Sequence, residues 1–132
     1  GADRAGRAVK LGRDSAGAGP IIAGFARGGF RVDDNIYTAL RITPMRADGW
    51  SPPPLEALTV AALDTLLDLD PLPEFLLLGT GAKLCHPPRA LIEALEVQGI
   101  GVEAMDSRAA ARAWGVLRSE GRRIAAALYP LG

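Results

Sequence analysis

The feature that most constrains the fold is a short apolar run, Phe75 to Leu78, that ends at Gly79-Thr80-Gly81. A continuous apolar run bounded by turn residues is typical of a strand that is buried on both faces of a sheet. Such a strand needs a covering layer on each side. The run therefore predicts a central sheet between two further layers.

The first half of the chain predicts strands followed by one helix. Residues 20–44 hold short β-prone runs separated by glycines, with a turn at 33–35 and a strand over 36–42. Pro44 ends this hairpin or meander. Ser51 and three prolines then open a helix whose apolar face continues to Leu69.

The second half predicts two helices and two strands. Pro87-Pro88 starts a helix over 89–98, and a second buried strand covers 100–105. Asp106 or Ser107 caps a helix that ends near Glu120. The last segment, 123–129, fits a strand, although its alanines are equally compatible with a helix.

This order of elements predicts a single α/β domain of three layers. It has a mostly parallel central sheet, an N-terminal antiparallel β-hairpin and three helices. Residues 1–19 mix Gly, Ala and Arg without apolar periodicity, so we expect a flexible N-terminal arm there and the domain over 20–132.

Composition excludes several classes of protein. No stretch of 18 consecutive apolar residues is present, so no membrane-spanning helix is expected. The single Cys excludes an intramolecular disulfide, and with one His it argues against a zinc site, so we expect no metal. The net charge of zero argues against nucleic-acid binding as the main task.

The turn from Gly79 to Lys83 is the first candidate site, because ligands collect beyond the carboxyl ends of strands in open α/β sheets. Its glycines let the backbone approach a ligand, and exposed amides can hold an anion. A phosphate-binding P-loop needs Gly before its Lys and Ser or Thr after it. Here Ala82 precedes Lys83 and Leu84 follows it, so the turn departs from that pattern. The alternatives are a tight structural turn and a small-anion or surface recognition site.

Arginines around the predicted third helix form the second candidate site: Arg108, Arg112, Arg118, Arg122 and Arg123. The first two are four residues apart and share a helix face. One interpretation is an ion-pair network, involving Glu120, that ties the last helix to the last strand. The other is a recognition face for a carboxylate, a phosphate or an acidic partner.

Cys85 and His86 are adjacent, and adjacent side chains usually point apart, which argues against a thiol–imidazole pair for nucleophilic catalysis. No other His is present to serve instead. The residues therefore form no convincing catalytic constellation.

Several strings of residues, taken in order, resemble one family. They are Ile22-Ala23-Gly24-Phe25, Gly29-Phe30-Arg31-Val32, Leu76-Leu77-Leu78-Gly79-Thr80-Gly81, the run from Gly99 to Asp106, Ala110-Ala111-Arg112, Glu120-Gly121-Arg122-Arg123 and Ala125-Ala126-Ala127-Leu128. The chain resembles, over about residues 20–130, the Mth-type family of small bacterial and archaeal proteins of unknown function. That family is related to the mitochondrial complex I assembly factor three family.

The resemblance implies a three-layer α/β domain with no established enzymatic activity and no cofactor. For the mitochondrial relatives it implies protein–protein contacts during the assembly of membrane-bound complex I. By analogy it implies that a bacterial member works in the cytoplasm or at the inner face of the membrane. Many members have Tyr-Asn where this chain has Trp114-Gly115, so either that Asn is structural in the family or this member has a modified pocket.

We therefore predict a non-enzymatic interaction or assembly module with a protein partner. The predicted binding residues are Gly79, Thr80, Gly81, Lys83, Arg112, Glu120 and Arg122. The alternative is a small-anion or metabolite-binding protein, or an enzyme, in which Arg112 holds an anionic group and Glu120 orients it or moves a proton. Both readings require the loop at Thr80 to lie near Arg112.

Overall fold

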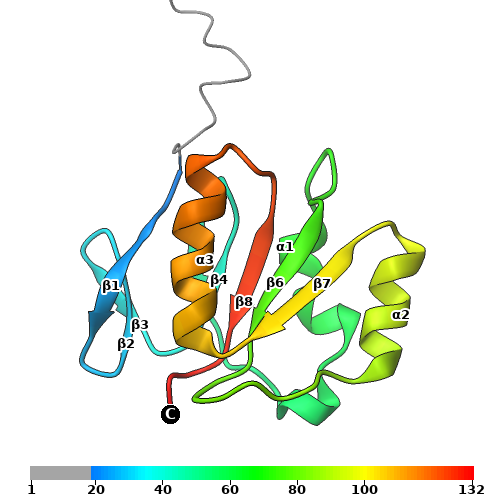
Figure 1. The fold of residues 1–132 in the computed structure, drawn as a ribbon, viewed down its shortest axis with the longest axis horizontal. Coiled ribbons are helices and arrows are strands. Elements are labelled where there is room, and N and C mark those ends of the chain that lie inside the picture. Colours follow the sequence, from blue (N-terminus) through cyan, green and yellow to red (C-terminus); the bar gives the residue numbers. More distant parts are fainter. Residues whose placement is uncertain (1–18) are drawn as a thin grey trace, which may run out of the picture.

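The computed structural model describes residues 19–132 (Figure 1). The predicted flexible arm, apart from Gly19, lies outside the described residues. The elements follow in the order β1 (Ile22–Ala26), β2 (Gly29–Val32), β3 (Asn35–Tyr37), β4 (Leu40–Ile42), β5 (Ala47–Gly49), the 3-10 helices η2 (Leu55–Ala57) and η3 (Val60–Leu63), α1 (Asp64–Leu67), β6 (Phe75–Gly79), α2 (Arg89–Val97), β7 (Gly101–Met105), α3 (Ser107–Ser119) and β8 (Ala125–Leu128).

The strands form two sheets. The smaller sheet has the order β1-β2-β3 and is antiparallel throughout. The larger sheet has the order β5-β4-β8-β6-β7. Strands β8, β6 and β7 run parallel, β4 is antiparallel to β8, and β5 is antiparallel to β4. The predicted α/β class is confirmed, with a central sheet that is partly parallel and partly antiparallel.

The central strand β6 is buried on both faces, as its apolar run predicts. Leu77 faces the core on the side of α3, where it joins Trp114. Leu76 and Leu78 face the opposite core, which they share with apolar residues of α1 and α2. All three leucines are 0% exposed, so the sheet separates two apolar cores.

The smaller sheet completes the layer that α3 begins. In Figure 1, β1 runs alongside α3 on the side away from β8. Phe30 and Val32 of β2 belong to the same core as Trp114. The indole nitrogen of Trp114 donates a hydrogen bond of 3.1 Å to the carbonyl of Pro20, which ties the beginning of β1 to the helix.

The helix predicted to run from Ser51 to Leu69 is wrong. The segment holds two 3-10 helices and one turn of α-helix, because the backbone at Leu58 and Thr59 is extended. Leu58, Leu63 and Leu66 are nevertheless buried against the sheet. The spacing of the apolar residues indicates which of them face the core. It does not fix the backbone conformation, because a series of short turns can bury the same residues as one continuous helix.

Two strand predictions also need correction. The strand predicted over 36–42 is divided into β3 and β4, because the chain leaves the smaller sheet at Thr38 and enters the larger one at Leu40. Strand β7 lies at an edge of the larger sheet and is only half-buried. The last segment is a strand, since β8 pairs with both β4 and β6.

Candidate functional site

The turn after β6 is held by the hydroxyl of Thr80. The Oγ1 hydroxyl donates to the carbonyl of Lys83 at 2.8 Å and accepts the amide of Cys85 at 3.0 Å. The carbonyl of Met105, at 3.2 Å, is a second acceptor. Thr80 is 8% exposed, so its hydroxyl closes the turn from the inside.

The first residue of α3, Ser107, connects the same turn to the last strand. Its hydroxyl donates to the carbonyl of Tyr129 at 2.7 Å and accepts the amide of Gly81 at 2.9 Å. The helix approaches so closely that a Cβ on Gly79 would lie 2.8 Å from the Ser107 hydroxyl oxygen and 3.2 Å from the Cβ of Ala110. The small residues of this turn therefore allow α3 to pack on the sheet.

These contacts leave few donors for an anion. The amide of Thr80 donates to the carbonyl of Met105 at 2.8 Å, and the amide of Gly81 is taken by Ser107. Lys83 is exposed at the tip of the turn. The geometry accounts for Gly79, Thr80 and Gly81 as structural residues, and their role in binding stays a prediction.

The arginines after α3 hold the opposite end of the sheet. The guanidinium of Arg122 donates two hydrogen bonds to the carboxylate of Glu74, at 2.8 and 3.0 Å. The amide of Arg123 donates to the same carboxylate at 3.2 Å. Hydrogen bonds from Arg122 hold the pKa of Glu74 below its ordinary value. This pair ties the entry of β8 to the entry of β6.

Arg118 turns inward from the last turn of α3. It is 2% exposed, and its guanidinium donates to the carbonyl of Arg122 at 2.7 Å. Burial lowers the pKa of Arg118. The predicted ion-pair network through Glu120 is therefore wrong: the last helix is tied to the segment before the last strand by the hydrogen bond from Arg118 to a carbonyl, and the ion pair of Arg122 is with Glu74, ahead of β6.

The structure does not bring the seven predicted binding residues together. Thr80 follows the carboxyl end of β6, whereas Arg122 precedes the amino end of β8. Because β6 and β8 are parallel, these two residues lie at opposite ends of the sheet. Helix α3 has 13 residues and begins beside the Thr80 turn, so Glu120 lies about 20 Å farther along the helix axis. The hypothesis of one concavity shared by Thr80, Arg112 and Glu120 is therefore wrong.

Arg112 belongs to a different group of side chains, on the outer side of α3. Arg108 and Arg112 both lie over the ring of Phe25 in β1, with guanidinium carbons 5.1 and 6.0 Å from the ring centre. Phe25 is 37% exposed, and both arginines are exposed. We call these three residues the arginine–phenylalanine surface. The i, i+4 spacing predicted the arginine pair, but no sequence signal placed Phe25 beneath it.

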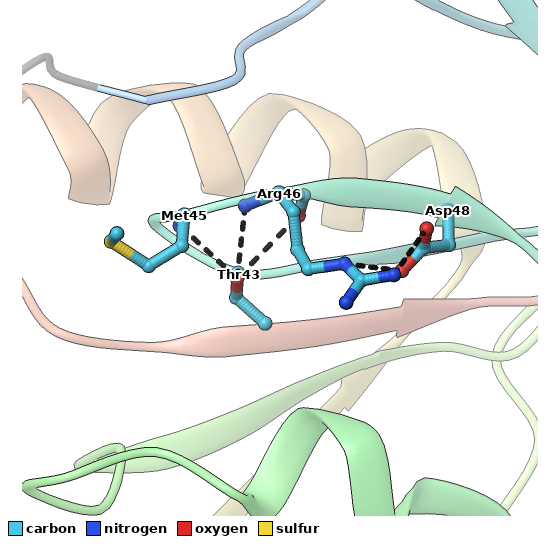
Figure 2. Close-up of polar contacts among 4 residues, drawn as sticks. All are labelled: Thr43, Met45, Arg46 and Asp48. Carbon is cyan, nitrogen blue, oxygen red and sulfur yellow. Dashed lines mark hydrogen bonds and ion pairs between the residues drawn. The ribbon is translucent and has the colours of Figure 1, made fainter.

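Sequence reasoning also missed the tip of the β4–β5 hairpin, which Figure 2 shows. The hydroxyl oxygen of Thr43 accepts the amides of Met45 at 3.1 Å and Arg46 at 3.2 Å, and Arg46 forms an ion pair of 3.0 Å with Asp48. These bonds hold Met45 in a fixed turn with 79% of its surface exposed. The signal was Thr-Pro-Met-Arg, a turn-forming string that contains one apolar residue.

Two further findings bear on chemistry. Within residues 19–132, no three His, Cys, Asp or Glu side chains are grouped so that they could hold a metal ion. None of the helices in the same range has the length and apolar character needed to cross a membrane. Cys85 is half-buried and His86 is exposed beside it.

The chain is similar in sequence and in fold to several known proteins. It is 31% identical over 123 residues to NADH dehydrogenase (ubiquinone) 1 alpha subcomplex assembly factor 3 of Danio rerio. The matched region covers 92% of this chain and 71% of that protein. A crystal structure of a Bordetella parapertussis protein is 31% identical, with a TM-score of 0.76, and the match covers 86% of this chain and 97% of that one.

A solution structure from Bordetella pertussis, described as a Mth938-like domain, is 26% identical with a TM-score of 0.73, and the match covers 86% of this chain and 87% of that one. The family described as "Protein of unknown function (DUF498/DUF598)" matches residues 22–129. The chain therefore belongs to this family, the Mth-type family that its sequence strings predict.

Proposed function

We propose that the chain is a protein-interaction module without enzymatic activity that takes part in the assembly of respiratory complex I. The observation that carries this proposal is the 31% identity, over 92% of the chain, to a protein named as an assembly factor of NADH dehydrogenase. The partner would be a subunit or an assembly intermediate of that membrane complex, met at the inner face of the membrane.

The internal contacts of the polar side chains in the candidate site argue against catalysis by them. The hydroxyls of Thr80 and Ser107 are both engaged with backbone groups. Arg122 is engaged with Glu74. Groups that take part in acid–base or nucleophilic chemistry need to reach a substrate, and these groups are committed to holding the fold.

The test is deletion of the gene that encodes the chain, followed by native gel analysis of the membranes. We expect the amount of fully assembled NADH dehydrogenase to fall and smaller subassemblies to accumulate. Expression of the intact chain should restore the assembled enzyme. Equal amounts of assembled enzyme in the deletion strain and its parent would overturn the proposal.

A thermal-shift screen of the purified chain separates this function from the small-ligand alternative. A ligand at a hundred times its dissociation constant adds about 2.7 kcal/mol to the free energy of unfolding. In a domain of this size that is a rise of several degrees in melting temperature. We expect no such rise with common nucleotides, organic acids or phosphate. A shift that Arg112→Gln abolishes would favour the small-anion function instead.

A further inference from the structure

We infer that the arginine–phenylalanine surface is the docking site for an acidic segment of a partner protein. The inference rests on the proposed function and deepens it, because it assigns the contact to one surface and gives the chemistry of what binds there. It follows from how Phe25, Arg108 and Arg112 are held, from their charge, and from the small size of the patch.

The aromatic ring is fixed in place from below. Phe25 lies opposite Phe30 in the β1–β2 register, and the two rings meet edge to face with centres 6.2 Å apart. Phe30 is 0% exposed and belongs to the core beneath α3. An exposed ring that rests on a buried one loses little conformational freedom on binding, which favours its use as an anchor.

The two guanidiniums are held by that ring and not by a carboxylate. Within residues 19–132, no Asp or Glu lies within ion-pair distance of Arg108 or Arg112. By comparison, Arg46 is paired with Asp48 and Arg122 with Glu74. The surface therefore presents two adjacent positive charges that an incoming carboxylate can neutralise.

A third positive charge belongs to the same end of the molecule. The turn between β1 and β2 lies at the end where α3 begins (Figure 1). That turn contains Arg27, which is exposed and has a φ of 53°. An acidic segment that crosses α3 at its first two turns therefore meets basic side chains from both the helix and the smaller sheet.

The size and composition of the patch favour a protein segment over a polyanion. Nucleic acids and anionic membranes are bound by extended basic faces that contact many phosphates. Here two arginines lie over one aromatic ring in a chain whose net charge is zero. Arginine and aromatic residues are the types that dominate protein–protein hot spots, and the i, i+4 arginines match carboxylates spaced along a peptide.

The experiment selects ligands from a library of random twelve-residue peptides displayed on phage. The full chain is the bait, and a parallel selection uses the double variant Arg108→Gln/Arg112→Gln. The matched control is Arg89→Gln, an exposed arginine at the start of α2, whose helix packs on the other face of the sheet. Unchanged melting temperatures establish that each variant is folded.

We expect the intact chain and the Arg89 variant to enrich the same acidic peptides, and the double variant to lose them. Binding of a labelled enriched peptide should be about tenfold weaker or more in the double variant, and should weaken as salt is raised. Phe25→Leu should weaken the same peptide several-fold while its salt dependence is kept, because that change removes the ring and leaves the charges.

Four results would overturn the inference. The first is enrichment of no acidic peptide by the intact chain, and the second is equal enrichment by the double variant. The third is loss of binding to vesicles of phosphatidylserine and phosphatidylcholine in the double variant without any peptide preference, which would assign the surface to a membrane. If the double variant restores assembled NADH dehydrogenase in the deletion strain, the docking site is wrong and the proposed function remains.

Discussion

Gly79 shows how a single residue determines the packing of a helix on a sheet. A Cβ at this position would lie 2.8 Å from the Ser107 hydroxyl oxygen and 3.0 Å from the Ser107 Cα. Neither atom can move freely, because the Ser107 hydroxyl joins Gly81 to Tyr129. We predict that Gly79→Ala lowers the free energy of unfolding by about 1–3 kcal/mol, as for other overpacked cores. Denaturant-induced unfolding measures it.

The control for this substitution is Gly115→Ala. Gly115 lies within α3, and apart from its chain neighbours and the adjacent turns of its own helix backbone, no atom lies within 4 Å of the position of an added Cβ. Alanine in a helix interior is favoured over glycine by about 0.5–1 kcal/mol, so this variant should be more stable than the natural chain. Equal effects of the two substitutions would contradict the close approach at Gly79.

Tyr129 gives a test of burial through pH. Its hydroxyl donates to the carbonyl of Pro53 at 2.7 Å, and its ring meets Trp50 edge to face. Burial, with the nearby charge of Glu56, raises the pKa of Tyr129 to about 12. The folded pKa lies above the ordinary value near 10, so the stabilising contribution is complete below pH 10 and is lost as pH rises toward 12.

We therefore expect the free energy of unfolding to fall between pH 10 and 12 more steeply in the natural chain than in Tyr129→Phe. Absorbance at 295 nm, which follows tyrosine ionisation, should show a late transition that the variant lacks. An early transition at the ordinary pKa that Tyr129→Phe reduces, with no late transition in the natural chain, would show that Tyr129 is open to solvent.

At the scale of elements, the sequence is informative where local signals and tertiary packing agree. Helix α3 begins at the predicted cap, since the Asp106 carboxylate accepts the amide of Ala109 at 2.9 Å. Helix α2 follows its two prolines, and Gly99 adopts a φ of 82° just beyond it. In these elements the capping chemistry and the apolar spacing point to the same ends.

The segment 51–69 is the opposite case. Its apolar residues have helical spacing, yet the backbone at Thr59 has φ −126° and ψ 166°, outside the helical region. The leucines reach the core from short turns, and the turns supply few of the i to i−4 hydrogen bonds of a regular helix. Local spacing alone cannot distinguish these arrangements, because both place the same leucines against the sheet.

Because segment 51–69 consists of short turns, we predict that its amide hydrogens exchange at a different rate from those of the central strands. We expect residues 55–67 to exchange faster than the amides of β8, which is paired on both sides by β4 and β6. Hydrogen exchange followed by mass spectrometry of overlapping peptides measures both regions in one experiment. Protection of 55–67 equal to that of β8 would contradict the division of this segment into short turns.

At the scale of the whole molecule, the topology decides which predicted site residues meet. The sequence predicts the buried strand, the final helices and the family, because each depends on local strings. It does not predict that α3 carries Arg112 toward β1 and away from the Thr80 turn, since this depends on where the smaller sheet packs. The contact between Phe25 and Arg108 joins residues from opposite ends of the described chain.

The topology also separates two kinds of polar group. The turn at Thr80 and the Arg122–Glu74 pair lie at opposite ends of the parallel strands, where both bind neighbouring parts of the fold. The arginine–phenylalanine surface joins α3 to β1 through the Phe25 ring, and among residues 19–132 neither of its arginines forms an ion pair. We therefore propose that the first two groups hold the fold and that the third binds a partner.

Photocrosslinking in living cells tests this assignment most directly. A photoreactive benzoylphenylalanine replaces Phe25 in one strain, Lys83 in a second and Arg122 in a third, and crosslinked proteins are identified by mass spectrometry. The account predicts that position 25 captures a partner protein through an acidic segment, and that positions 83 and 122 do not. Capture from position 83 or 122, with none from position 25, would contradict it.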